Sequence, residues 1–279
     1  MKTKRVIEHI VGWLKEYSDK SGTHGFVIGI SGGIDSAVAS TLCAMTGKKV
    51  LCLEMPIYQA ESQVNRALEH IAWLKNSHLE VSDQRIELTA TFDSMLKALP
   101  KVEDEYLLNL ALANTRARLR MSTLYYFAGI EHLLVAGTGN KVEDFGVGFY
   151  TKYGDGGVDL SPIADLMKTE VYEIAKELGI IESIQKAAPT DGLWGDDRTD
   201  EEQIGASYPE LEWAMGFSKQ WNPKDTQWTH EGDRWLLSGS DQVLNERQRT
   251  VLEIYLRLNR ASQHKVLPIP VCAIPVALK

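Results

Sequence analysis

The feature that most constrains the fold is an apolar run that breaks at two glycines and resumes as a helix. Residues 26–30 (Phe-Val-Ile-Gly-Ile) favour a buried β-strand, residues 31–36 (Ser-Gly-Gly-Ile-Asp-Ser) a tight turn, and residues 37–44 a helix. A turn of this kind directs several unpaired backbone N–H groups outward, and the helix dipole adds partial positive charge. The stretch therefore predicts a phosphate-binding loop.

The loop also contains an acid, Asp35. A carboxylate beside a bound phosphate would repel it unless a cation lay between the two, so Asp35 indicates a bridging Mg²⁺. No Lys-Ser/Thr pair follows at the spacing of a Walker A loop. The alternative interpretation is a glycine turn that enters a helix, with Asp35 as an N-terminal cap.

Composition limits the possible functions. We expect one domain over residues 1–279, without a membrane span, because no run of about 18 apolar residues occurs. The three cysteines are scattered and form no CxxC, which favours a reduced, cytoplasmic protein. The net charge of −8 argues against a nucleic-acid surface, so a polyphosphate would be bound locally, by Mg²⁺ and a few basic side chains.

Strands and helices are predicted to alternate along the first half of the chain. After a helix over 3–19, strands are expected at 26–30, 48–53, 84–89 and 132–136, with helices between them. This order predicts an α/β fold, a parallel sheet flanked by helices on both faces. Ligands bind at the C-terminal ends of such strands, so loops 31–36 and 137–140 (Gly-Thr-Gly-Asn) can line one crevice.

The second half is less regular. Residues 141–157 are long for a connection and rich in glycine and aromatic residues, which favours a functional loop. Helices are predicted over 166–178, 200–215 and 243–263, before a Pro-rich tail. Residues 216–242 contain three tryptophans and interrupt the pattern as a folded surface insertion, an ordered flap or a subunit contact.

Two motifs carry a resemblance to a known family: Ser-Gly-Gly-x-Asp-Ser at 31–36 and Thr-Lys-Tyr-Gly-Asp-Gly-Gly-x-Asp at 151–159. With them the chain resembles the ammonia-dependent NAD⁺ synthetases of the N-type ATP pyrophosphatase (adenine nucleotide alpha-hydrolase-like) superfamily. The first motif alone indicates only the superfamily, whereas the second is far more specific. Further matches follow in order at 114–121, 137–143, Lys168, 188–190 and His264-Lys265.

The resemblance implies a reaction in which nicotinate adenine dinucleotide (deamido-NAD), ATP and ammonia give NAD⁺, AMP and pyrophosphate through an acyl-adenylate. It also implies Mg²⁺ as the cofactor and a homodimer whose interface the dinucleotide crosses. Only 25 residues precede the central strand, so we expect no glutaminase domain and free ammonia as the nitrogen source, although an external glutaminase partner is an alternative.

The resemblance also assigns residues. The loop that wraps the pyrophosphate comprises Gly29, Ile30, Ser31, Gly32, Gly33, Ile34, Asp35 and Ser36; the other ATP contacts are Thr138, Lys168 and Thr190. Asp35 and Glu143 match the Mg²⁺ ligands. The residues that match deamido-NAD contacts are Arg118, Lys152, Asp159, His264 and Lys265.

Two residues are candidates for the chemistry itself. By resemblance, Lys168 stabilises charge on the α-phosphate. Asp155, between glycines, is the candidate for binding ammonium and accepting its proton, because only neutral ammonia is nucleophilic. Without the resemblance, Lys168 would be interpreted as an exposed lysine at a helix start and Glu143 as a solvated loop acid.

Helix geometry separates three nearby arginines. Residues i and i+4 share a helix face, whereas i+2 lies nearly opposite, so Arg118 points away from Arg116 and Arg120. The three cannot form one basic patch. The resemblance selects Arg118, and the other two are expected to be solvated or paired near Glu103 or Asp104.

Two other functions remain as alternatives. Another adenylating pyrophosphatase, such as a tRNA-thiolating enzyme, would need a reactive cysteine pair and a basic RNA surface. A non-catalytic nucleotide-binding protein on the same fold would not need Lys168, Glu143 and Asp155 together with the loop.

Overall fold

The structure is a computed structural model, and it describes residues 1–190, 199–219, 228–231, 234–237 and 243–278 of the chain. At its centre lies a four-stranded parallel sheet in the order β3-β2-β1-β4. These strands are β1 (Gly25–Gly29), β2 (Lys49–Glu54), β3 (Val81–Arg85) and β4 (Leu133–Val135). In the register, Gly25 pairs with Lys49 of β2 on one side and with Leu133 of β4 on the other.

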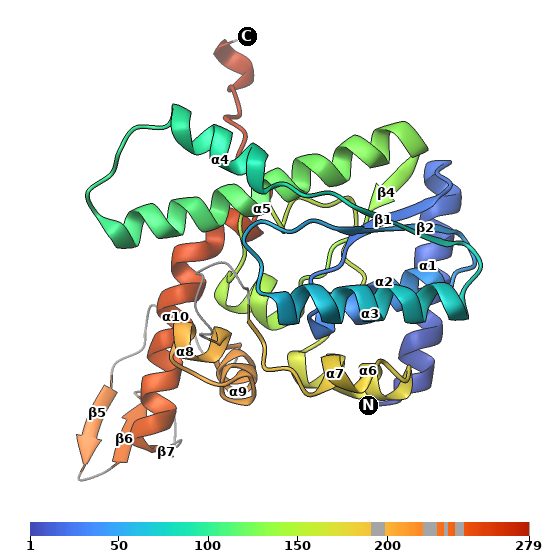
Figure 1. The fold of residues 1–279 in the computed structure, drawn as a ribbon. Coiled ribbons are helices and arrows are strands. Elements are labelled where there is room, and N and C mark those ends of the chain that lie inside the picture. The colour runs from blue at the N-terminus through green and yellow to red at the C-terminus, as the bar shows by residue number, and fades with distance from the viewer. Residues whose placement is uncertain (191–198, 220–227, 232–233, 238–242, 279) are drawn as a thin grey trace.

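Helices cover both faces of the sheet (Figure 1). One face packs against α1 (Thr3–Ser21), α2 (Ile34–Ala44), α3 (Glu61–Ser77), α6 (Lys168–Glu177) and α7 (Glu182–Gln185), and the other against α4 (Thr89–Ala98) and α5 (Glu105–Glu131). Side chains alternate between these layers: Phe26 and Ile28 of β1 join the first cluster, and Val27 joins the second. Strands buried on both faces explain the continuous apolar runs and confirm the predicted α/β fold class.

A third apolar cluster joins the C-terminal elements. It packs α9 (Tyr208–Ser218) and α10 (Glu246–Val266) against the π-helix η1 (Val142–Val147). Nearby in Figure 1 lie α8 (Asp200–Ile204) and an antiparallel sheet of β5 (Trp228–Glu231), β6 (Arg234–Leu237) and β7 (Val243–Leu244). A short 3₁₀-helix, η2 (Val276–Leu278), lies in the tail.

Several predicted boundaries are wrong. The third strand is Val81–Arg85 rather than 84–89, because its pairing with β2 starts at Val50 and Val81. The helix expected over 200–215 is split into α8 and α9 at Gly205, whose φ of +89° ends α8. The start of the functional loop 141–157 is helical, as η1.

The 216–242 segment falls largely outside the described residues. Its described backbone comprises the end of α9 and the strands β5 and β6. Its role therefore remains a prediction, as does the single-domain organisation. Among the described residues, no helix is both long enough and apolar enough to span a membrane.

Candidate active site

The glycine loop connects β1 to α2 at the C-terminal edge of the sheet. Gly32 has a φ of +79°, and a Cβ there would lie 2.5 Å from the carbonyl oxygen of Gln63, so this position requires glycine. The hydroxyl groups of Ser31 and Ser36 lie 3.1 Å apart, and Ser36 donates to the carbonyl of Gly33 at 3.0 Å. These contacts fix the conformation of the loop at the N-terminus of α2.

Asp35 does not cap α2, so the alternative interpretation of this residue is wrong. The N-cap is Gly33, and Asp35 lies in the first turn. Its side chain is directed instead toward elements far along the chain, at the boundary of a cavity above the strand ends. The same cavity is lined by the loop residues 29–36, by Thr138 and by Thr190, so the two predicted crevice loops do meet.

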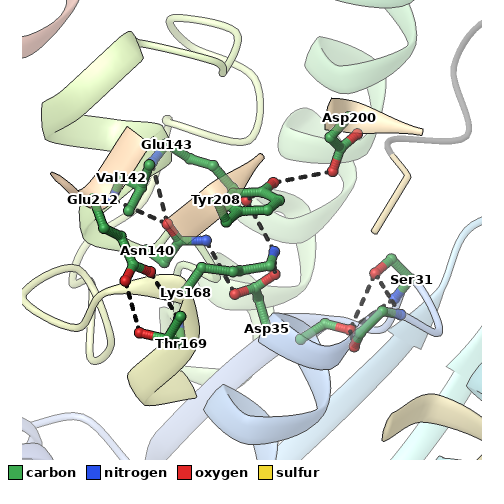
Figure 2. Close-up of polar contacts among 12 residues, drawn as sticks. Ser31, Asp35, Asn140, Val142, Glu143, Lys168, Thr169, Asp200, Tyr208 and Glu212 are labelled. Atoms are coloured by element: carbon green, nitrogen blue, oxygen red, sulfur yellow. Dashed lines mark hydrogen bonds and ion pairs between the residues drawn. The ribbon is translucent and has the colours of Figure 1, made fainter. Parts of the chain in front are cut away.

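A buried ammonium group lies between two carboxylates beside this loop (Figure 2). Lys168 Nζ is 2.5 Å from Asp35 Oδ2 and 2.9 Å from Glu143 Oε1, and the Lys168 side chain is only 3% exposed. Burial alone would lower the pKa of Lys168, but the two carboxylates raise it above its ordinary value. Lys168 is therefore a buried cation, and the interpretation as an exposed helix-start lysine is wrong.

The same ammonium stabilises charge on Glu143. Burial acts to raise the pKa of Glu143, but Lys168 and a hydrogen bond from Tyr208 lower it below its ordinary value. Tyr208 Oη donates to Glu143 Oε1 at 2.6 Å and lies 3.2 Å from Asp200 Oδ2. Glu143 is thus an ionised carboxylate held in one orientation rather than a solvated loop acid.

Sequence reasoning missed two residues of this network, Tyr208 and Asn140. Asn140 donates from Nδ2 to Asp35 Oδ1 at 3.2 Å, and its Oδ1 accepts from the backbone N–H groups of Val142 and Glu143 at 3.1 Å each. It lies in the Gly-Thr-Gly-Asn loop that was predicted to line the crevice, which is the one available signal. Tyr208 is 65 residues from Glu143 in sequence, and no local pattern indicates the contact.

The cavity is acidic. Among the described residues, six acidic side chains line it against three basic ones: Asp35, Glu54, Glu143, Asp144, Asp155 and Asp200 against Arg66, Arg120 and Lys168. Burial, followed by the charges of Glu143, Asp155 and Asp35, raises the pKa of Asp144 to about 8. An anionic ligand would need an added cation here.

Asp155 lies on the cavity wall and accepts a hydrogen bond from the backbone N–H of Thr151 at 2.9 Å. Its side chain opens toward water, yet the protein atoms that surround it desolvate the carboxyl group and raise its pKa to about 6. A carboxylate with this pKa can exchange a proton near neutral pH.

The arginines divide as helix geometry predicts, but the expected surroundings of Arg120 are wrong. Arg120 donates to the carbonyl of Met55 at 2.9 Å and to Gln59 Oε1 at 2.6 Å, and burial lowers its pKa to about 10. It lines the cavity instead of pairing near Glu103 or Asp104. Arg116 lies over the ring of Phe92, 5.5 Å from its centroid.

Four of the five predicted dinucleotide contacts lie together, outside the lining of the main cavity. Arg118 donates to the carbonyl of Lys152 at 3.4 Å, Lys152 donates to the carbonyl of His264, and Lys265 follows in α10. Asp159 is separate: it accepts from Tyr125 Oη at 2.9 Å and from the N–H of Val135 at 2.8 Å, and it lines a second cavity.

The fold and site together define a class: an α/β protein with a glycine loop at a helix N-terminus beside a buried lysine–carboxylate network. Comparison with known proteins identifies the family. A family model described as NAD synthase matches residues 6–247. The chain belongs to the NAD synthase family.

Individual relatives agree with this placement. The NH₃-dependent NAD⁺ synthetase of Carboxydothermus hydrogenoformans is 36% identical over 92% of this chain and 93% of its own. The NMN synthetase structure from Francisella tularensis superposes with a TM-score of 0.77 at 28% identity, over 99% of both chains. NAD⁺ synthetase from Burkholderia pseudomallei gives a TM-score of 0.69 at 26% identity, over 96% of this chain and 91% of that one. Family membership makes the protein a ligase of the ammonia-dependent NAD⁺ synthetase type.

The pKa of Asp144 makes a prediction about stability. The folded protein keeps this proton up to about pH 8, whereas the unfolded chain releases it near pH 3.8, so stability falls as the pH rises between these values. The two values differ by about four pH units at about 1.4 kcal/mol each, so Asp144→Asn should raise the free energy of unfolding by up to about 5 kcal/mol at pH 8 and by little at pH 4. Urea denaturation at both pH values measures this.

The matched control is Asp165→Asn, at a side chain that is 97% exposed. We expect this change to leave the pH dependence of unfolding as in the wild type. An equal gain for Asp144→Asn at pH 4 and pH 8 would contradict the assigned cause.

Proposed function

We propose that the protein amidates deamido-NAD with ammonia in an ATP-dependent reaction, giving NAD⁺, AMP and pyrophosphate. The observation that carries this proposal is the buried contact of Lys168 with Asp35 and Glu143 beside the glycine loop. It brings a cation and two oriented carboxylates to the place where a polyphosphate would lie. The family relatives supply the identity of the reaction.

A carboxylate resists attack by ammonia, so the reaction needs an activated acyl group. An oxygen of the nicotinate carboxylate attacks the ATP α-phosphorus, and the bond to pyrophosphate breaks. The backbone N–H groups of residues 31–36 and the hydroxyls of Ser31 and Ser36 bind the departing pyrophosphate, while Lys168 offsets charge at the α-phosphate. The nitrogen of ammonia then attacks the acyl carbon, the bond between that carbon and the oxygen of AMP breaks, and the nitrogen releases one proton to solvent as the amide forms.

The proton balance falls to Asp155. Ammonia arrives mainly as ammonium at neutral pH, and only its neutral form has the lone pair for the attack. Asp155 lies on the cavity wall with a carboxyl pKa of about 6, so it can bind ammonium as a carboxylate and accept its proton.

The donor set of the cavity fits Mg²⁺. Among the described residues, no group of three or more His, Cys, Asp or Glu is arranged to hold a metal alone. Asp35 and Glu143 both offer carboxylate oxygens, and Mg²⁺ is commonly held by one or two carboxylates with phosphate and water completing its shell. When bound, Mg²⁺ would supply the positive charge that this acidic cavity needs to accept a polyphosphate.

A second candidate reaction is amidation of nicotinate mononucleotide to NMN. The Francisella tularensis NMN synthetase structure superposes with a higher TM-score than the Burkholderia pseudomallei NAD⁺ synthetase, 0.77 against 0.69. In addition, Lys152 and Lys265 donate to carbonyl groups of their own chain instead of lying open to a ligand. A mononucleotide would depend less on these two lysines than a dinucleotide would.

The deciding experiment supplies purified protein with ATP, Mg²⁺, ammonium and either deamido-NAD or nicotinate mononucleotide. We expect pyrophosphate release coupled to NAD⁺ formation, with a higher kcat/KM for deamido-NAD. A higher kcat/KM for the mononucleotide would select the second candidate. Absence of both products at saturating ammonium would refute the proposed chemistry.

The cysteines do not support the alternative function, a tRNA-thiolating enzyme, which would need a reactive pair of them. Cys43 and Cys52 are buried, and burial raises the pKa of both thiols, that of Cys52 to about 12. Thiols of this kind are poor nucleophiles. Since all three cysteines are free, we also infer a reducing, cytoplasmic location.

We also propose a homodimer that uses α4 and α5. The fully buried residues of α5 are small, Ala113, Ala117 and Ala128, whereas its partly buried Leu112, Leu119, Leu124 and Phe127 pack against the second apolar cluster. Further large apolar side chains are exposed on α5, and Met95 of α4 and Leu99 just after it are exposed as well. Those on α5 include Tyr106, Leu107, Leu110, Tyr126 and Ile130. The two helices extend along one side of the sheet in Figure 1. Apolar surface of this extent is typical of interfaces.

Leu107→Glu tests this interface. A charge placed in an apolar contact is costly, so the variant should sediment as a monomer at concentrations where the wild type is a dimer. Leu79→Glu, at a fully exposed leucine outside α4 and α5, is the control and should remain dimeric. A dimeric Leu107→Glu protein would place the interface elsewhere.

The role of Asp155 predicts a pH profile. Below about pH 6 the group is protonated, so kcat/KM for ammonium should fall about tenfold per pH unit, and it should level off above pH 6 with respect to this group. Asp155→Asn should lower kcat at least about a hundredfold and remove this limb of the profile. Steady-state kinetics from pH 5 to 8 measure both, and an unchanged limb in the variant would assign the titration to another group.

A further inference from the structure

The π-helix η1 forms a wall between two cavities. Glu143 and Asp144 line the cavity of the glycine loop. Lys141, just before η1, and Phe145, within it, line the second cavity, together with Trp13 and Tyr17 of α1. A π-helix has wider turns than an α-helix and accommodates an extra residue, and such turns occur often at functional sites. The π register thus decides which side chains face which cavity.

A helix end of this kind leaves carbonyl groups without partners. Here α10 supplies the donors. Asn259 donates from Nδ2 to the carbonyl of Gly146 at 2.6 Å and more weakly to that of Phe145 at 3.4 Å. Lys265 donates to the carbonyls of Gly148 and Tyr150, both at 2.7 Å.

The Asn259 side chain is itself fixed. Gln263, one turn further along α10, donates from Nε2 to Asn259 Oδ1 at 3.0 Å, which leaves the Asn259 amide nitrogen directed at η1. The turn after η1 also packs closely against α10. Gly148 in this turn has a φ of +67°, and a Cβ there would lie 2.0 Å from Cβ of Ser262 in α10. α10 therefore contacts the backbone of η1 and of the turn that follows it.

We propose that Asn259 is a positioning residue that keeps η1 in the π register, so that Glu143 and Asp144 both face the active-site cavity. Asn140 holds the start of η1 through the N–H groups of Val142 and Glu143, and Asn259 holds its end. Without the second contact the turn can relax toward an α-helical register, which moves Glu143 away from Lys168. The family model ends at residue 247, so most of α10, with Asn259, lies beyond it.

The positioning role of Asn259 rests on the proposed amidation reaction only in the part that concerns ligand binding. Two variants test it. Asn259→Asp keeps the shape but removes the donor, and Asn259→Ala removes the whole amide. Arg257→Gln, at an exposed position of α10, is the matched control.

The first measurement is hydrogen exchange of residues 142–150 in the ligand-free protein, which requires no activity. We expect exchange at least about fivefold faster in both Asn259 variants and unchanged in Arg257→Gln, because one hydrogen bond contributes about 1 kcal/mol. The second is calorimetric binding of inorganic pyrophosphate at increasing Mg²⁺. The half-saturating Mg²⁺ concentration should rise about five- to tenfold in the Asn259 variants and stay unchanged in the control.

Wild-type exchange in 142–150 in either folded variant would overturn the proposal. So would faster exchange with an unchanged Mg²⁺ requirement, because Asn259 would then stabilise the turn without orienting the site. If both variants lose the helical circular dichroism signal, Asn259 is needed for folding and the positioning role is refuted. Failure of the amidation assay leaves the exchange result intact, so the two proposals fail separately.

Discussion

The arrangement of the active site depends on the ammonium group of Lys168. An ionised lysine that is almost fully buried is stable only when paired, and here its partners come from two other elements, Asp35 on α2 and Glu143 on η1. This one side chain thus fixes the start of α6 against α2 and against η1. Removing one partner would leave an uncompensated charge in the interior, which is why the three elements keep one relative position.

The contact also offsets part of the negative charge of the cavity. Lys168 neutralises only part of the charge, and Asp144 and Asp155 respond with raised pKa values. The folded protein thereby accepts unfavourable electrostatics that a metal ion and a polyphosphate together would relieve. Carboxyl groups with raised pKa values lower the stability of the folded state near neutral pH, and such groups are concentrated at functional sites.

Much of the fold follows from local sequence. The apolar runs of β1 and β2, the amphipathic pattern of α1 and the glycine loop each depend on neighbouring residues, and they were predicted close to where they lie. The boundaries that failed depend on distant partners or on one backbone angle. β3 is positioned by its pairing with β2, and α8 ends at Gly205 because of a positive φ. The π-helix was missed because its ends are held by Asn140 and by Asn259, more than a hundred residues away from each other.

The sequence by itself determined the α/β class, the glycine turn between β1 and α2 and, through the 151–159 motif, the family. These follow because short-range geometry and motif spacing are written in consecutive residues. Only the tertiary structure decided that Lys168 is buried between two acids, that Tyr208 orients Glu143, and that Arg120 lines the cavity while Arg118 does not. Those facts depend on burial and on contacts between residues far apart in the chain, and no local pattern specifies either.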